Sequence, residues 1–237
     1  MDSGYPMRIN KYLSQKGYAT RRGADALIER GQVLINGRKA VLGDKVEEDD
    51  EVTVKSRGNK KQYRYYAFNK PKGIVTHSAQ GEDSDIEDAI QGTPELRGVF
   101  PVGRLDKDSH GLLILTDDGR VTDRLLNPER THEKEYTVRV KNKLRANFKE
   151  RMEQGVDIEG YMTKPAKVRI NGEFSFTITL TEGKKHQIRR MVAALFNEVD
   201  ELKRMRVMNI RLGKLPSGSY RAIEGEELAE FLGLLGL

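Results

Sequence analysis

The chain has 237 residues, of which 33% are charged and 37% hydrophobic. Its net charge of +6 with a pI near 9.3 indicates either a polyanionic partner such as nucleic acid or, equally, a well-solvated surface. The absence of Cys excludes a disulfide framework and a thiolate nucleophile. No apolar run approaches the roughly 20 residues that span a bilayer, and the first ten residues lack the apolar core of a signal peptide, so we expect a cytoplasmic protein.

Residues 7–55 predict a small α/β unit of two short helices followed by a small sheet. Ile9 and Leu13 share one face of the first helix. The pair Asn36-Gly37 between short apolar runs predicts a hairpin with a type I′ turn. Residues 1–62 hold 13 Lys or Arg against 9 Asp or Glu, so this unit is more basic per residue than the remainder of the chain.

The remainder predicts a larger α+β domain. Residues 56–65 are polar and basic and are typical of a linker, and a new pattern runs from residue 66 to 232. Strands are expected at 99–102, 112–116, 134–140 and 174–183, and helices at 118–127, 143–155 and 186–196. Runs of strands alternating with short helices favour a mixed, mostly antiparallel sheet.

The stretch "GRLDKDSHGLLILTDDG", residues 103–119, holds four Asp around a buried-looking strand. It nearly fits a calcium loop, but His110 at position 5 is a poor ligand, Asp117 replaces the usual Glu at position 12, and the flanks predict strands where the motif needs helices. A turn explains Asp108 well. It explains Asp106 less well, because Asp106 follows a strand and precedes a loop that can place it over a cleft.

The same stretch resembles the central motif of the pseudouridine synthases, in the branch that modifies single ribosomal RNA positions. Four further segments resemble motifs of that branch in the same order: "NKPKG" at 69–73, "EKEYTV" at 133–138, "TEGKKHQIRRM" at 181–191 and "RVMNIRLGKLPSGSYRAI" at 206–223. The details "DKDSHG" and "HEKEY" resemble the large-subunit synthase F group most. The N-terminal unit resembles the alpha-L (S4-like) RNA-binding domain of a small-subunit ribosomal protein.

This resemblance implies the catalytic residues. Asp106 corresponds to the essential carboxylate of the family, which must stay ionised away from water and therefore needs an adjacent cation, implied to be Arg189. Tyr136 corresponds to the Tyr that stacks on the target uracil. Arg104 corresponds to a residue that fills the gap left by the extruded base. Whether Asp106 adds to the sugar or removes a sugar proton is left open.

The resemblance and the charge pattern together imply the RNA contacts. We expect them from Lys70, Lys72, Arg8, Lys11, Arg21, Arg22, His186, Gln187 and Arg190. Lys70 and Lys72 could equally lie on a solvated turn without contacting RNA. Arg190 could lie at a solvated helix end.

The expected activity is the isomerisation of uridine to pseudouridine by a monomer without cofactor or metal. The expected substrate is a 23S rRNA stem-loop near the peptidyl transferase centre, with a tRNA anticodon loop as a second one. The alternatives are a 16S rRNA synthase and a non-catalytic RNA-binding protein on a synthase fold. A uracil methyltransferase is disfavoured because that chemistry usually needs a Cys nucleophile.

Overall fold

The computed structural model describes residues 5–19, 21–55, 62–77, 84–127 and 130–237, and the side chain of Arg22 lies outside this description. The chain divides into two units, Met1–Arg64 with Asp117–Asp123 and Tyr65–Thr116 with Arg124–Leu237. Most of the predicted linker falls on residues 56–61, which are not described. The next strand begins at Tyr65, inside that predicted linker.

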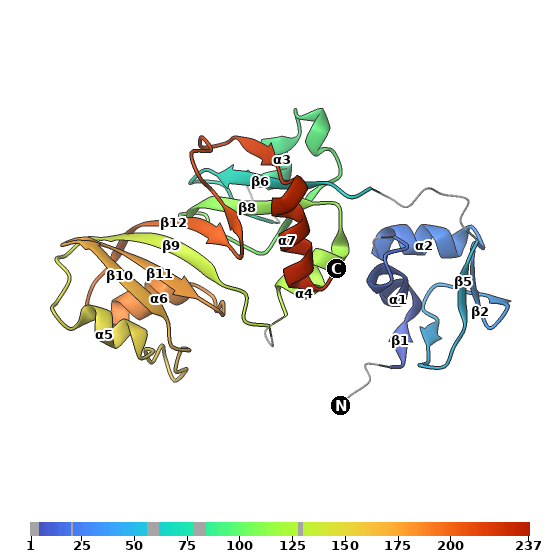
Figure 1. The fold of residues 1–237 in the computed structure, drawn as a ribbon, viewed down its shortest axis with the longest axis horizontal. Coiled ribbons are helices and arrows are strands. Elements are labelled where there is room, and N and C mark those ends of the chain that lie inside the picture. The colour runs from blue at the N-terminus through green and yellow to red at the C-terminus, as the bar shows by residue number, and fades with distance from the viewer. Residues whose placement is uncertain (1–4, 20, 56–61, 78–83, 128–129) are drawn as a thin grey trace. The chain divides into compact units, whose positions relative to one another are not determined.

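The N-terminal unit is built from two helices and small antiparallel sheets (Figure 1). Its elements are β1 (Met7–Arg8), α1 (Ile9–Gln15), α2 (Arg21–Glu29), β2 (Val33–Ile35), β3 (Arg38–Lys39), β4 (Lys45–Val46) and β5 (Val52–Val54). Ile9 and Leu13 are buried in its core, as their helical spacing predicts. Asn36 and Gly37 both have positive φ, 49° and 78°, which confirms the hairpin turn between β2 and β3.

The second unit contains a nine-stranded sheet in the order β10-β11-β9-β12-β8-β6-β14, with β13 paired to β12 and β7 to β8. The strands are β6 (Tyr65–Lys70), β7 (Phe100–Val102), β8 (His110–Thr116), β9 (Lys134–Val140), β10 (Lys167–Gly172), β11 (Ser175–Leu180), β12 (Val199–Val207), β13 (Ile210–Arg211) and β14 (Tyr220–Ala222). The helices are α3 (Ile86–Ile90), a 3₁₀ turn at Pro94–Leu96, α5 (Phe148–Glu153), α6 (Gln187–Ala194) and α7 (Gly225–Leu235). Helix α4 (Gly119–Leu125) falls mostly in the segment Asp117–Asp123, which groups with the N-terminal unit. Only the β8–β12 pair is parallel among the described strand pairs, which confirms the predicted mixed, mostly antiparallel α+β fold.

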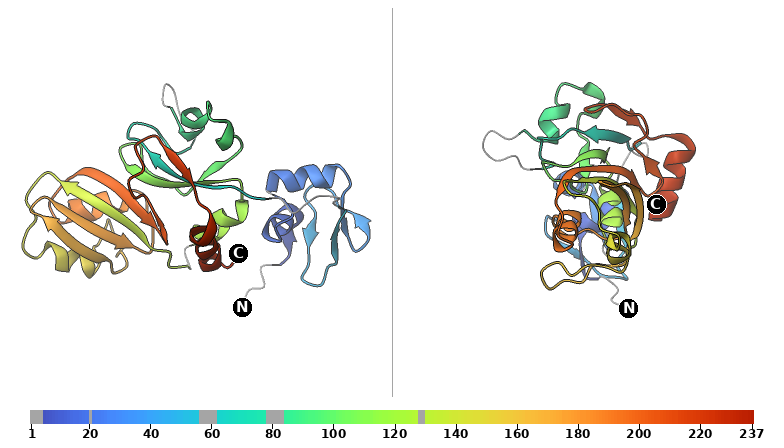
Figure 2. Two further views of the ribbon diagram at one scale, coloured as in Figure 1. Left: turned by 45° about the horizontal axis from the view of Figure 1, so that its top comes forward. Right: turned by 90° about the vertical axis from the view of Figure 1, so that its left-hand side faces the viewer.

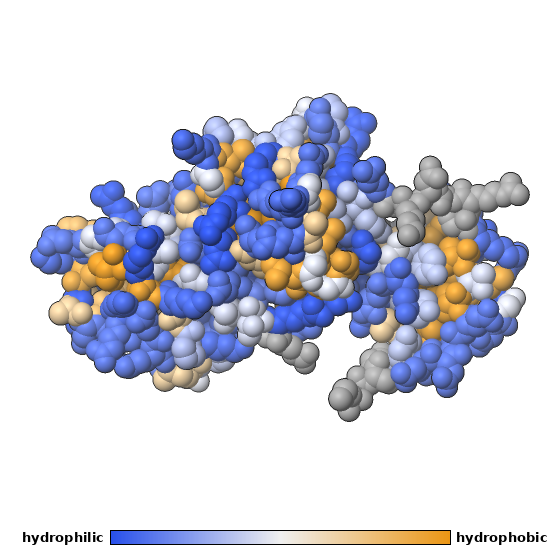
Figure 3. Space-filling model, viewed as in Figure 1, coloured by the Kyte–Doolittle hydropathy of each residue, from blue (hydrophilic) through white to orange (hydrophobic). Residues whose placement is uncertain are grey.

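Two hydrophobic cores cover different parts of this sheet. Helices α5 and α6 pack on β9, β10, β11 and β12, where Met152, Phe176 and Met191 are fully buried (Figure 1). Helix α3 packs on β6 and β8 through Ile86 and Leu113, at the other end of the sheet (Figure 2). Hydrophilic residues cover most of the face drawn in Figure 3.

The two halves of the sheet meet at one short parallel pair. Lys203 pairs with His110 and Arg204 with Gly111, and no further register pair joins β12 to β8 in the described strands. Gly111 has φ 104°, and a Cβ at this position would lie 2.4 Å from the carbonyl oxygen of Arg204. Glycine is therefore required for the close approach of the two strands. The loop that carries Asp106 directly precedes this junction.

Candidate active site

Side chains from several elements hold the main chain of the loop that carries Asp106. The hydroxyl of Thr76 donates to Leu105 O (2.6 Å) and accepts from Leu105 N (3.0 Å). Lys70, the last residue of β6, donates from Nζ to the carbonyl oxygens of Asp106 (3.2 Å) and Ser109 (2.8 Å). These bonds fix the backbone on both sides of Asp106 and leave its carboxylate free to project from the loop.

Arg204 of β12 holds the same loop from the other half of the sheet. Its Nε donates to Leu112 O (2.6 Å) and its Nη1 to Arg104 O (3.3 Å). The Arg204 side chain is buried, with 3% of its surface exposed. The loop is thus attached to both strands of the parallel junction.

A cleft of about 650 Å³ opens beside this loop, within the second unit. Asp106 and Arg104 line it from the loop, Tyr136 and Lys134 from β9, and Arg204 from β12. The further wall residues are Lys184, Lys185 and His186 from the segment before α6, and Gln187, the first residue of α6. The lining contains seven Lys or Arg but only two acids, so the cleft favours an anionic ligand.

The side chain that contacts the Asp106 carboxylate is not the predicted one. His186 Nε2 lies 3.7 Å from Asp106 Oδ1, and it is the one ion-pair partner of Asp106 in the described part of the chain. Arg189 contacts Asp108 O (3.3 Å) and Ser109 Oγ (3.4 Å) instead. The predicted Arg189–Asp106 pair is therefore absent here, because the loop oxygens that follow Asp106 take up the guanidinium.

Lys70 is not an RNA contact, which corrects the prediction. Its side chain is fully buried, and its three hydrogen bonds go to the carbonyl oxygens of Pro71, Asp106 and Ser109. Burial lowers the pKa of Lys70 to about 8, against the opposing effect of the Asp106 charge. The "NKPKG" motif therefore buries its first Lys under the loop, whereas Lys72 is exposed.

Gln187 and Arg190 are also engaged within the protein. The Gln187 amide donates to Glu182 (2.8 Å) and accepts from Lys184 N (2.8 Å), so its polar atoms shape the wall of the cleft. Arg190 Nη2 donates to Ile158 O and to the Glu159 carboxylate, both at 2.8 Å. Gln187 is buried, and Arg190 is held by Ile158 and Glu159 although its Nε has no hydrogen-bond partner among the described residues, so both RNA contacts stay predictions.

The predicted contacts of the N-terminal unit lie on α1, α2 and β1. Arg8 is exposed on β1 and Lys11 is half-buried on α1. Arg21 is exposed on α2, 3.7 Å from Asp123. The side chain of Arg22 falls outside the described part of the chain. Arg8 and Lys11 have no ion pair among the described residues and remain the predicted phosphate contacts.

The calcium interpretation of the loop fails on the geometry of its surroundings. Strands β7 and β8 flank Asp106 and Asp108, as predicted, where a calcium loop needs helices. Asp117, at position 12 of the motif, accepts a hydrogen bond from Arg64 N (2.9 Å). Within the described ranges no group of three or more His, Asp or Glu is arranged to hold a metal. Nor does any helix there combine the length and apolar character that crossing a bilayer requires.

Sequence reasoning missed two cleft residues, Lys134 and Arg204. A signal for Lys134 was present, because it stands two residues before Tyr136 in an alternating strand and so shares its face. Arg204 carries no comparable signal, since "VDELKRMRV" places several charged residues along one strand.

Comparisons with known proteins agree with this site. Residues 64–194 match the RNA pseudouridylate synthase family, and residues 7–52 match the S4 domain. The dual-specificity RNA pseudouridine synthase RluF of Escherichia coli K12 is 40% identical over 97% of this chain and 79% of its own length. Ribosomal small subunit pseudouridine synthase A of Pasteurella multocida is 31% identical over 95% of this chain and 99% of its own.

A solved structure described as a pseudouridylate synthase matches the fold. It covers 96% of this chain and 99% of its own, with a TM-score of 0.69 and 29% identity. The family match includes the loop of Asp106, the strand of Tyr136 and the segment of His186. The chain belongs to the RNA pseudouridylate synthase family and carries an S4 domain at its N-terminus.

Proposed function

We propose that this enzyme converts one uridine of a 23S rRNA stem-loop near the peptidyl transferase centre into pseudouridine, and that a tRNA anticodon loop is a second substrate. The observation that carries the proposal is the cationic cleft around Asp106 and Tyr136. The relative at 40% identity is named a dual-specificity enzyme, which supports two RNA substrates. The basic N-terminal unit supplies affinity for the surrounding RNA.

The proposed reaction starts with extrusion of the target nucleotide, because a base inside a stem cannot reach Asp106. Arg104 is exposed beside the cleft, where its side chain can occupy the vacated position. The uracil ring enters and stacks on Tyr136. A volume of about 650 Å³ suits one nucleotide and excludes a base pair with its neighbours.

Asp106 then cleaves the bond between C1′ and uracil N1. It does so either by adding to C1′ or by removing the C2′ proton, and in both cases the bonding electron pair leaves with the uracil. The ring turns and C5 bonds to C1′. In the first route the Asp106–C1′ bond breaks as the new bond forms, and in the second route C2′ regains its proton from Asp106. The C5 proton is then lost to a base while N1 gains a proton. Atoms and electrons balance without a cofactor, and His186 lies beside the Asp106 carboxylate.

The principal alternative substrate is 16S rRNA. The small-subunit relative is 31% identical and supports it less than the 40% relative supports the proposal. A purely RNA-binding role is disfavoured, because the site contains both Asp106 and Tyr136 in one cleft.

The test is a map of pseudouridines in total RNA from cells with and without this gene, with complementation by the wild type and by Asp106→Asn. We expect one 23S site and a tRNA site to disappear and to return only with the wild type. Loss of a 16S site selects the alternative substrate. An unchanged map contradicts the proposed activity.

A further inference from the structure

Two cations flank the stacking ring at the floor of the cleft. In the β9–β12 ladder Arg204 lies directly opposite Tyr136, and Lys134 lies opposite Val207. Alternation along β9 places Lys134 on the same face as Tyr136, and directly opposed residues on adjacent strands have Cβ atoms roughly 5 Å apart. Lys134, Tyr136 and Arg204 all line the cleft.

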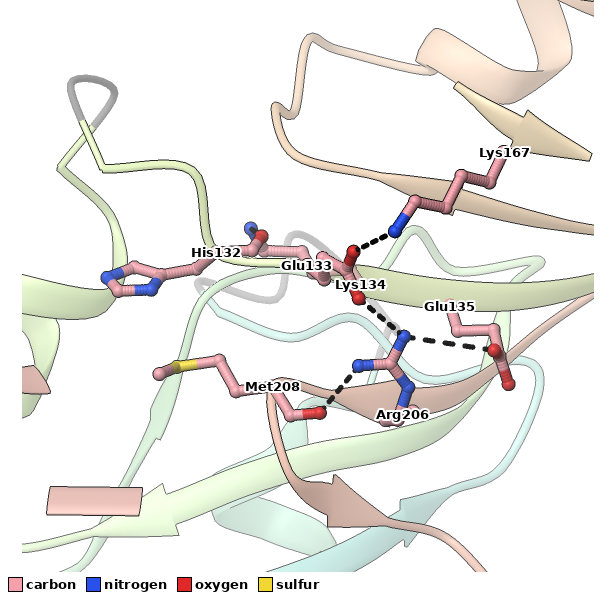
Figure 4. Close-up of polar contacts among 7 residues, drawn as sticks. All are labelled: His132, Glu133, Lys134, Glu135, Lys167, Arg206 and Met208. Atoms are coloured by element: carbon pink, nitrogen blue, oxygen red, sulfur yellow. Dashed lines mark hydrogen bonds and ion pairs between the residues drawn. The ribbon is translucent and has the colours of Figure 1, made fainter. Parts of the chain in front are cut away.

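The acids next to Lys134 in sequence point to the opposite face of β9. Glu133 binds Lys167 Nζ and Arg206 Nη2, both at 2.9 Å, and Glu135 lies 3.8 Å from Arg206 Nη2 (Figure 4). They therefore do not neutralise the cations in the cleft. Among the described residues, neither Lys134 nor Arg204 has a carboxylate within ion-pair distance.

Both cations keep unused donors. Lys134 Nζ has one hydrogen bond, to His132 O at 3.2 Å. Arg204 uses Nε and Nη1 on carbonyl oxygens, and its Nη2 has no partner within the described part of the chain. Burial lowers the pKa of Lys134, and the charge of Arg204 lowers it further. Two partly buried cations with no carboxylate beside them raise the free energy of the site. An anion bound between them lowers this free energy.

We propose that Lys134 and Arg204 donate hydrogen bonds to a carbonyl oxygen of the uracil and stabilise it as an anionic leaving group. This inference rests on the proposed reaction. When the C1′–N1 bond breaks, the electron pair stays on the ring, and the charge spreads over N1, O2 and O4. Donors fixed where charge develops lower the barrier more than they strengthen ground-state binding. Lys134 and Arg204 thereby become catalytic residues that complement Asp106.

A phosphate group of the RNA is the competing anion for this site. The depth of the site favours the base, because Arg204 is only 3% exposed and stands across from the ring of Tyr136, on which the base stacks. The exposed cations Lys184 and Lys185 provide phosphate contacts at the rim instead.

The experiment compares Lys134→Met with the wild type in single-turnover reactions on one stem-loop that carries uridine or 5-fluorouridine at the target. Fluorine stabilises the uracil anion and lowers the need for protein donors. We expect Lys134→Met to consume uridine about 10²-fold more slowly than the wild type. With 5-fluorouridine the loss of rate should be about tenfold smaller. RNA affinity should stay unchanged, and Lys134→Arg should recover part of the rate.

Lys167→Met is the matched control. It removes the β10 cation that pairs with Glu133, outside the cleft, and should leave the rates with uridine and with 5-fluorouridine unchanged. Equal losses for both nucleotides, with weaker and less salt-dependent binding, would assign the site to phosphate and overturn the inference. Full activity of Lys134→Met also overturns it. An inactive wild type contradicts the proposed function itself. That result differs from the two outcomes that overturn only the role of Lys134 and Arg204, because in those outcomes the wild type is active.

Discussion

At the scale of single residues, the site depends on groups that hold the backbone around Asp106. Thr76, Lys70, Arg204 and Arg189 each bind main-chain atoms of the loop, from four different segments of the chain. Each contact restricts the loop on a different side. This arrangement pre-positions the Asp106 carboxylate before substrate arrives, as effective catalysis requires.

Lys70→Met should lower the single-turnover rate by about 10²-fold, or ~2.7 kcal/mol, without weakening RNA binding. The reason is that three carbonyl oxygens lose their shared donor, while the cations on the surface all remain. Rates and dissociation constants measured on the same stem-loop separate the two effects. Weaker binding at an unchanged rate would return Lys70 to the RNA contacts.

The rate of the wild type should also fall above pH 8, where Lys70 loses a proton and one of its donors. The pKa of Lys70 is lower in the folded protein than its ordinary 10.5, so the unfolded chain binds more protons between about pH 8 and 10.5. Stability therefore gains from Lys70 as the pH rises, and unfolding through this group does not explain a lower rate. In Lys70→Met this alkaline limb should be absent, which a pH series on both proteins checks.

At the scale of elements, the parallel pair of β8 and β12 joins the two halves of the sheet. Gly111→Ala would place a Cβ 2.4 Å from Arg204 O and strain a positive φ. We expect a loss of about 3 kcal/mol or more in the free energy of unfolding. Gly92→Ala is the control, because its Cβ meets nothing within 4 Å, and it should stay within about 0.5 kcal/mol of the wild type. Equal denaturation midpoints for the two variants would refute the role of Gly111.

The helices and strand of the N-terminal unit should supply binding without chemistry. The double variant Arg8→Ser/Lys11→Ser should weaken RNA binding and reduce the slope of log K against log[salt] by roughly 0.7–0.9 for each phosphate that the protein no longer neutralises. Lys141→Ser/Lys149→Ser removes the same charge where both Lys pair with Glu, and should change the slope less. Titrations at several salt concentrations measure this, and identical slopes for the two doubles contradict it.

Local periodicity predicted the helices, strands and turns well where neighbouring residues in the sequence determine them. The alternation of Phe176, Ile178 and Leu180 gave a strand with these residues buried, and Asn36-Gly37 gave the turn. The helix predicted over 143–155 is shorter, because Leu144 N bonds to Glu173 O of the neighbouring segment.

The site residues that belong to sequence motifs were predictable. The site residues that are positioned by packing between distant segments were not. Asp106 and Tyr136 share the cleft as the resemblance implied, whereas Arg189, the implied partner of Asp106, contacts Asp108 and Ser109 instead. The burial of Lys70 and the approach of Arg204 depend on strand pairings between distant segments, which local patterns do not contain.

At the scale of the whole molecule, two units with separate cores divide the work. Residues 1–62 carry a net excess of four cations, and the cleft of the second unit is the proposed site of the chemistry. Each unit has its own buried core, so the surface charges of one can vary without disturbing the packing of the other. RNA affinity and turnover should therefore be separable by mutation.

The central claim is that the Asp106 carboxylate performs the isomerisation in this cleft. The most direct measurement is single-turnover conversion of uridine in a defined 23S stem-loop by the wild type and by Asp106→Asn, with dissociation constants measured in parallel. We expect conversion by the wild type, unchanged RNA affinity of the variant, and no detectable pseudouridine from the variant. Turnover by Asp106→Asn above about 1% of the wild-type rate, a loss of only ~2.7 kcal/mol, would contradict an essential role for this carboxylate.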